Sequence, residues 1–271
     1  MRAFVVVLLF SLWCPLGRAD VDLGIAPVQQ ATPVWCWLAV GEMVFRRFEV
    51  PAVNDHYQCG VIGAISIASN QAQCARDCRL CNFPAGDATR LMGMLVGYPR
   101  RVALLTGQST PRLFVSHTNT LSAVELRREL DGGRPVLAGI NPSGRPDVFG
   151  ASAHVALIVG YVDGSDGDNS LTLIVNDPFP FSASTWPDPY QAKGATLLAP
   201  GRYGIRYDSY VNQLGWAESF LVRVDGKHAA APLQCFAATP LAQQRCPASA
   251  LAKAGERCSC GGVAGVVVDS G

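Results

Sequence analysis

The cysteine in the stretch QQATPVWCWLAVGEMVFRRF (residues 29–48) lies where an apolar pattern with helical spacing begins. A thiolate is a strong nucleophile, and negative charge is favoured at the N-terminus of a helix by backbone N–H groups and the helix dipole. Cys36 is therefore a candidate nucleophile for acyl transfer. Half of a disulfide and a buried core thiol are the alternatives.

A thiol nucleophile needs a general base, and the chain offers only a few histidines. They are His56, His117, His154 and His228. His154 begins the apolar run HVALIVGY, and the run LTLIVN follows after a turn-forming segment, which predicts a β-hairpin. His154 is therefore the candidate base.

The hairpin also offers a residue that could orient the imidazole. If the turn is centred near residues 165–166, His154 faces Asp177 across the hairpin, within reach of an imidazole–carboxylate hydrogen bond. A shift of one residue selects Asn176, whose amide could fill the same role. The hairpin pattern alone leaves both residues as candidates.

Acyl transfer further requires hydrogen-bond donors for the oxyanion of the tetrahedral intermediate. The backbone N–H of Cys36 is one candidate donor. A side-chain amide just upstream could be a second, and Gln29 and Gln30 are both available there.

The number of cysteines separates Cys36 from the rest. Ten cysteines are present, and Cys14 lies in an apolar N-terminal run, so nine remain, an odd number. Eight of them form two groups of four, which predicts disulfides whose connectivity the sequence does not give: Cys59, Cys74, Cys78 and Cys81, then Cys235, Cys246, Cys258 and Cys260. A zinc site in the first group is the alternative.

The N-terminal run indicates export. Arg2, an apolar stretch and the small residues of GRA predict a signal peptide at residues 1–19, cleaved before Asp20. The run is too short for a membrane anchor of about 20 residues. A net charge of +1 gives no electrostatic footprint for nucleic acid or an anionic membrane. We expect a secreted or periplasmic protein without stable membrane insertion after cleavage.

The elements that must position these residues follow from local patterns. Thr32 and Pro33 predict a helix cap and first position, and the helix should end near Arg46 and Arg47. The apolar stretch GVIGAISIAS predicts a second helix. A capping box that begins at Ser122 predicts a third helix, which should extend to Leu130. The predicted strands are residues 135–140, 154–161, 171–176 and 218–224.

Helices first and strands later predict an α+β fold. We expect one domain at residues 20–226 with a cysteine-rich insert at 51–85, followed by a cysteine-rich appendage at 227–271. The acidic segment 163–170 predicts a solvated turn, because it does not fit the EF-hand calcium loop.

Three segments, and their order along the chain, together resemble the papain-like cysteine peptidases. The segments are Gln30 six residues before Cys36-Trp37, the AHVALIVGY around His154, and the IVNDP that ends in Asp177-Pro178. The cysteine-rich insert and GRPVLAGI are similar to the bacterial secreted branch that includes avirulence-type effector proteases. The resemblance covers roughly residues 25–224.

The resemblance implies a helical half whose nucleophile helix packs on an antiparallel sheet half carrying the histidine and the aspartate. It implies a thiol protease with Cys36 as nucleophile, His154 as general base and acid, Asp177 as orienter and Gln30 as oxyanion donor. It implies protein or peptide substrates and no cofactor or metal. An amidase or acyltransferase with the same triad, or a non-catalytic binding protein on the same fold, are the alternatives.

Overall fold

The computed structural model describes residues 20–53, 56–68, 72–143, 154–164, 171–181, 187–224, 233–239, 242–247, 257–260 and 263–269. The predicted signal peptide and most of the acidic segment 163–170 lie outside the described residues. No helix in the described ranges is both long and apolar enough to cross a membrane.

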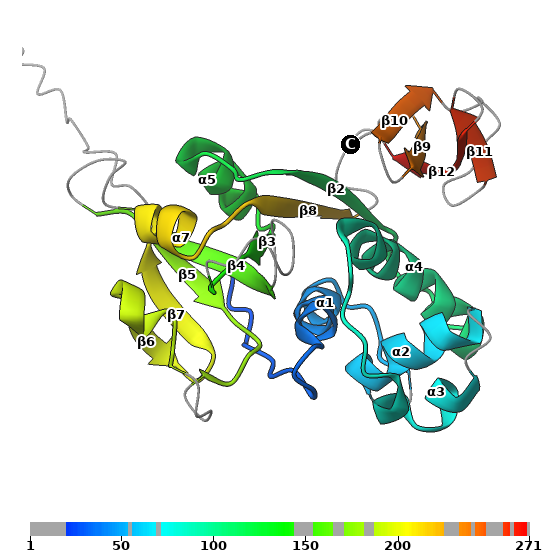
Figure 1. The fold of residues 1–271 in the computed structure, drawn as a ribbon, viewed down its shortest axis with the longest axis horizontal. Helices are drawn as coiled ribbons and strands as arrows, with labels where there is room; N and C mark the ends of the chain where they lie inside the picture. The colour runs from blue at the N-terminus through cyan, green and yellow to red at the C-terminus, as the bar shows by residue number, and fades with distance from the viewer. Residues whose placement is uncertain are drawn as a thin grey trace, which may run out of the picture.

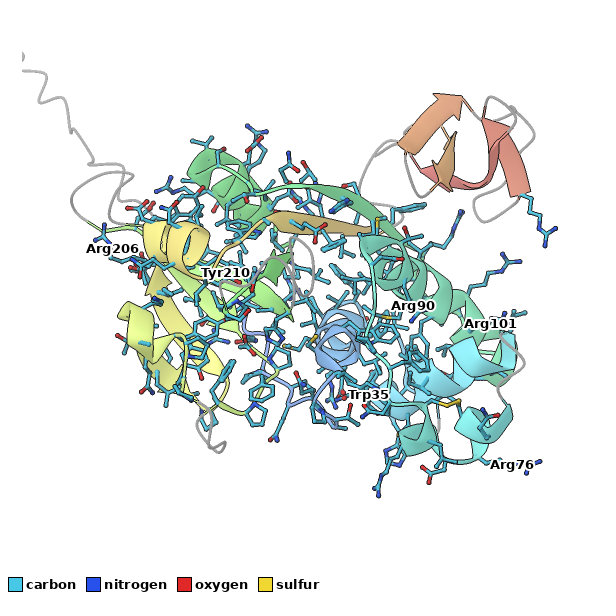
Figure 2. The ribbon with its side chains drawn as sticks, in the orientation of Figure 1. Trp35, Arg76, Arg90, Arg101, Arg206 and Tyr210 are labelled. Carbon is cyan, nitrogen blue, oxygen red and sulfur yellow. A yellow bond between two sulfur atoms is a disulfide. The ribbon has the colours of Figure 1, made fainter. Side chains whose placement is uncertain are left out.

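The first half of the chain is helical. Its elements are α1 (Cys36–Arg47), α2 (Tyr57–Ala68), α3 (Ala72–Arg76), the 3-10 turn η1 (Cys78–Cys81) and α4 (Ala88–Thr106). In Figure 1, α1 lies between the sheet and the other three helices. The exposed Arg76 and Arg101 project from these outer helices (Figure 2), whereas the Arg90 guanidinium lies over the Phe83 ring, 5.5 Å from its centroid.

The second half of the chain consists mainly of an antiparallel sheet whose strands differ in length. Its strands are β1 (Val21–Asp22), β2 (Leu113–Asn119), β3 (Val136–Ile140), β4 (His154–Val162), β5 (Thr172–Asn176), β6 (Thr196–Ala199), β7 (Arg202–Arg206) and β8 (Glu218–Val224). The order is β2-β8-β3-β4-β5-β7-β6, and β1 pairs with the end of β4. The short helices are α5 (Ala123–Asp131), η4 (Gln191–Lys193) and α7 (Tyr207–Gln213). The α+β prediction is confirmed.

Both faces of the sheet are covered. Leu157 and Val159 of β4 pack in one core with α1, and Ala156 and Ile158 pack in a second core with α5 and α7. A strand buried on both faces needs apolar residues at successive positions, not at alternate ones. This is why VLAGI and HVALIVGY read as unbroken apolar runs.

The predicted start of the first helix is wrong by about one turn. The helix begins at Cys36 and not after Thr32, because the Trp35 N–H bonds to the Thr32 carbonyl at 3.2 Å and closes a turn first. Trp35 is the N-cap and makes no side-chain capping bond. Cys36 is thus the first helical residue, and the helix ends at Arg47 as expected.

Other local predictions are confirmed. The Ser122–Glu125 capping box is present in both directions at the start of α5. The four predicted strands are found as β3, β4, β5 and β8, with ends that differ by no more than one residue. Residues 60–68 of the stretch GVIGAISIAS lie in α2.

The first cysteine group forms two disulfides, Cys59–Cys78 and Cys74–Cys81, which tie α2 and α3 to η1. The pairing contradicts a zinc site, because a sulfur atom in a disulfide is no longer available as a thiolate ligand. The described residues also hold no cluster of metal-ligating side chains.

The second cysteine group lies on a separate antiparallel sheet of order β10-β9-β12-β11. These strands are β9 (Leu233–Thr239), β10 (Ala242–Pro247), β11 (Arg257–Cys260) and β12 (Val263–Asp269). The backbone register places Cys235 opposite Cys246.

Candidate active site

Cys36 is the one free cysteine among those whose side chains the structure describes. It is half-buried at the first position of α1, where N–H groups of the first turn have no partner within the helix. The flanking Trp35 and Trp37 are completely buried in the core (Trp35 is labelled in Figure 2). The two tryptophans therefore fix the helix terminus by packing, and only the cysteine between them is partly accessible.

The structure brings His154 and Asp177 together. The Nε2 of His154 lies 2.8 Å from Oδ1 and 3.0 Å from Oδ2 of Asp177. The His154 side chain is 13% exposed, whereas that of Asp177 is fully buried. Because Nε2 is engaged by the carboxylate, Nδ1 is the ring nitrogen left for Cys36, with which His154 also makes a hydrogen bond.

The contact between His154 and Asp177 was predicted from a hairpin register in which the two residues face each other directly. That register is wrong by two residues. Asn176 pairs with Leu157, and continuing the ladder puts Ala156, not His154, opposite Asp177. A shift of two residues keeps every side chain on its face of the sheet. His154 and Asp177 are therefore diagonal neighbours, and the long imidazole spans the extra distance.

Asn176, the alternative orienter, faces away from His154. Its amide is fully buried and donates to the carbonyl of Ile25 at 2.7 Å, while its carbonyl accepts from Arg202 at 3.2 Å. Nη2 of Arg202 also donates to both carboxylate oxygens of Asp22, each at 2.6 Å. Asn176 thus holds the N-terminal segment against the sheet.

The carboxylate of Asp177 is fixed by two further donors. Its Oδ1 accepts from the Phe179 N–H at 2.8 Å, and its Oδ2 accepts from the Tyr190 hydroxyl at 2.7 Å. Burial, followed by the charge of Asp177, raises the pKa of Tyr190 well above its ordinary value, so this hydroxyl stays a donor. Tyr190 is itself stacked on Tyr203 with ring centroids 4.2 Å apart. Asp177 is consequently held in one orientation.

The charge of Asp177 governs the protonation of His154. Burial lowers the pKa of the imidazole because it disfavours the charged form. The charge of Asp177 and its hydrogen bond act in the opposite direction, helped by Cys36, and raise the pKa of His154 from 6.5 to about 10. The imidazolium form of His154 is therefore favoured at neutral pH.

Of the two candidate oxyanion donors, Gln30 is the buried one. It is 6% exposed, whereas Gln29 is exposed. The Gln30 N–H bonds to the Pro178 carbonyl at 2.9 Å, next to Asp177. Its side-chain Nε2 donates to the Thr32 carbonyl at 2.7 Å, which leaves the second amide hydrogen for another acceptor.

Gly201 supports Asp177 from behind, and a substitution there is our first prediction. It adopts φ 72°, its carbonyl accepts the Asp177 N–H at 2.8 Å, and a Cβ would lie 2.9 Å from the Asp177 carbonyl oxygen. Left-handed backbone costs an alanine about 1–2 kcal/mol. We expect Gly201→Ala to lose more free energy of unfolding than that, measured by urea titration.

Gly194 provides the matched control for this prediction. It has φ 80°, and a Cβ would meet no atom within 4 Å. Gly194→Ala should therefore lose only the backbone contribution. Equal losses in the two variants would show that the contact with Asp177 carries no energy.

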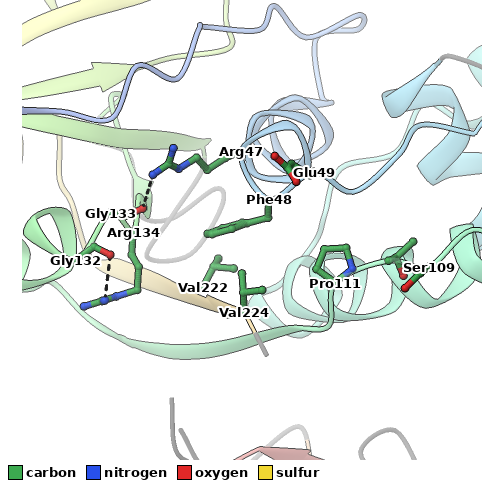
Figure 3. Close-up of a pocket in the computed structure, with 11 residues that line it drawn as sticks. Arg47, Phe48, Glu49, Ser109, Pro111, Gly132, Gly133, Arg134, Val222 and Val224 are labelled. Carbon is green, nitrogen blue, oxygen red and sulfur yellow. Dashed lines mark hydrogen bonds between the residues drawn. The ribbon is translucent and has the colours of Figure 1, made fainter. Parts of the chain in front are cut away.

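A pocket elsewhere on the molecule contains none of the candidate residues (Figure 3). It lies beyond the C-terminal end of α1, at the opposite end of that helix from Cys36. Its lining includes Arg47, Phe48, Glu49, Ser109, Pro111, Gly132, Gly133, Arg134, Val222 and Val224. The chemistry of the candidate site is therefore carried by its side chains at the N-terminal end of α1, not by this pocket.

Sequence reasoning missed two residues that hold the site. Tyr190 lies in a segment without a periodic apolar pattern, so no signal marked it. Gly201 lies in the turn between β6 and β7, and Gly after Pro was the one hint that a turn stood there.

A helix with a cysteine at its N-terminus, packed on an antiparallel sheet that carries histidine and aspartate, is the arrangement of the papain-like cysteine peptidases. The model of the Peptidase_C39 like family matches residues 22–197, more than half of the chain, and the chain belongs to this family. No curated protein matches the chain. Family membership supports peptidase activity, a hydrolysis of protein substrates.

Proposed function

We propose that the chain is an exported cysteine peptidase that hydrolyses peptide bonds through Cys36, His154 and Asp177. The observation that carries the proposal is the His154–Asp177 pair, at 2.8 Å, whose imidazole hydrogen-bonds to the free thiol at the start of α1. The family match, which includes all three residues, supports it. Two disulfides in the insert favour an oxidising compartment, outside the cell or in the periplasm.

In this proposal His154 moves one proton in each direction. The Cys36 thiolate attacks the peptide carbonyl carbon, the S–C bond forms, and the oxygen takes the electron pair as an oxyanion. The amide of Gln30 and the N–H of Cys36 stabilise that charge. When the C–N bond breaks, the imidazolium gives its proton to the leaving amine, and an acyl-enzyme remains.

The second half of the cycle restores the thiolate. His154, now neutral, takes a proton from water, and the oxygen of that water attacks the thioester carbon. The S–C bond then breaks, the carboxylic acid leaves, and the imidazolium–thiolate pair is formed again. Asp177 does not exchange a proton; it fixes the ring so that Nδ1 faces the sulfur.

The proposal is tested by labelling and by cleavage. The protein starting at Asp20 should take up one equivalent of an epoxide inhibitor of papain-type enzymes, under mildly reducing conditions, and peptide mass spectrometry should place it on Cys36. N-terminal profiling of a proteome digest should give new ends with the wild type and none with Cys36→Ala.

Two results would contradict the proposal in different ways. Absence of labelling would remove Cys36 as an activated thiol. Labelling without any peptide cleavage would leave the triad in place but assign it to another amide, as in an amidase or acyltransferase.

A further inference from the structure

The side chain of Gln58, at the start of α2, joins three separate groups. Its Oε1 accepts from the Ala31 N–H at 2.9 Å, and its Nε2 donates to the Gln29 carbonyl at 3.1 Å and to Oε2 of Glu42 at 3.1 Å. It is half-buried. One side chain from the cysteine-rich insert therefore holds the backbone on both sides of Gln30.

The three partners fix which way the amide points. The Ala31 N–H needs an acceptor, whereas the Gln29 carbonyl and the Glu42 carboxylate need donors. A reversed amide would set N–H against N–H and oxygen against two oxygens. Glutamate at this position would keep the first bond and place its second oxygen against Glu42. The arrangement thus requires glutamine by its chemistry as well as by its length.

Gln58 relates the Gln30 segment to the helix of the nucleophile. Glu42 lies on α1, is 8% exposed, and is held by Nε of Arg46 at 2.9 Å. On the opposite side, the Gln30 N–H is anchored to Pro178, beside Asp177. The segment 29–31 is consequently clamped between α1 and the sheet, with the Gln30 amide in the middle.

The clamp is itself anchored by a covalent link. Cys59, the next residue after Gln58, is joined to Cys78. The disulfide ties this end of α2 to η1 and limits how far the Gln58 side chain can drift. The cysteine-rich insert, which contributes none of the proposed triad, therefore reaches the site through Gln58.

We infer that Gln58 is a positioning residue that holds segment 29–31 so that the Gln30 amide meets the oxyanion. The inference rests on the proposed function. A group displaced by about 1 Å from its productive geometry can lose up to about 100-fold in rate. The expected effect lies on the step that develops negative charge on oxygen, because Gln58 is not in contact with Cys36 or His154 in any described hydrogen bond.

The test compares two reactions of the same thiol. Peptide hydrolysis forms an oxyanion, whereas alkylation of Cys36 by iodoacetamide displaces iodide at carbon and forms none. We expect Gln58→Ala and Gln58→Glu to lower kcat by about 10- to 100-fold, with KM and the alkylation rate changed by less than about threefold. Gln73→Ala, an exposed glutamine of the same insert, is the matched control and should leave all three values unchanged.

Two further measurements test whether Gln58 affects kcat through Gln30. In a Gln30→Ala background, Gln58→Ala should cost less than about threefold in kcat, because residues that act through one group are not additive. Hydrogen exchange should become faster for a peptide covering residues 29–34 and stay unchanged in α1, since the Ala31 N–H loses its acceptor.

The failures can be told apart. A wild type that neither hydrolyses peptides nor labels at Cys36 removes the proposed function, and the positioning role with it. An active wild type with an unchanged kcat in Gln58→Ala overturns the inference alone. An equal fall in kcat and alkylation rate also overturns it, because Gln58 would then support the fold in general. Full additivity with Gln30→Ala has the same consequence.

Discussion

Replacement of His154 by alanine is expected to lower kcat/KM for peptide hydrolysis by about 10⁴-fold or more. In the proposed mechanism the variant loses the group that gives a proton to the leaving amine and takes one from water, and the Cys36 thiol loses its imidazole partner. Steady-state kinetics on a peptide taken from the cleavage profile would measure the loss.

The same variant should also react more slowly with iodoacetamide at pH 7, because the thiol no longer has a neighbouring base that can take its proton. His56→Ala is the matched control, since that histidine is exposed and lies just before α2. A His154→Ala variant that keeps hydrolysis within about tenfold of the wild type would exclude the imidazole as general base and acid.

The second large effect is expected at Asp177, where two substitutions separate charge from orientation. Asp177→Asn keeps an oxygen that can accept from Phe179 and His154 but removes the negative charge. Asp177→Ala removes both, and we expect it to lose about 10²- to 10⁴-fold in kcat, more than the asparagine variant. Both losses are measured by steady-state kinetics.

The pH dependence gives the sign of the charge effect. Against the lowering effect of burial, the Asp177 carboxylate and, to a smaller extent, Cys36 raise the pKa of His154 to about 10, so the alkaline limb of kcat/KM should lie near that pH in the wild type. Without the charge, the pKa of His154 falls, and the limb of Asp177→Asn should move to lower pH. Asp188→Asn makes the same change beside Tyr190 and should leave the limb in place. A limb that does not move in Asp177→Asn would contradict the electrostatic role.

The His154–Asp177 pair also links folding to pH. The folded pKa of His154 lies above its unfolded value of 6.5. Its contribution to stability is therefore fully present below pH 6.5 and is lost as the pH rises toward about 10.

The features that sequence could predict are those with local causes. The capping box at Ser122, the four predicted strands and the free Cys36 each follow from neighbouring residues or from counting. The contact between His154 and Asp177 was reached through a register two residues away from the real one. The prediction of the contact was still correct, because side chains alternate with a period of two and a shift of two residues keeps both on the same face of the sheet.

The features that escaped prediction depend on distant partners. Tyr190 hydrogen-bonds to Asp177 from 13 residues further along the chain, and Gln58 reaches residues 29–31 from α2. The start of α1 was misplaced because Thr32 suits a cap, yet its carbonyl is used in a turn. Local propensity cannot rank such alternatives when tertiary contacts decide between them.

The position of β8 has a consequence for the timing of folding. It is the last strand of the large sheet in the chain, yet it lies inside the sheet, between β2 and β3. Through β2 it connects to α4 and the helical half, and through β3 to β4 and His154. Such long-range pairing forms late. If Cys36 and His154 act as proposed, a growing chain carries the Cys36 thiol before the sheet that holds His154 is complete, because β8 ends only at Val224.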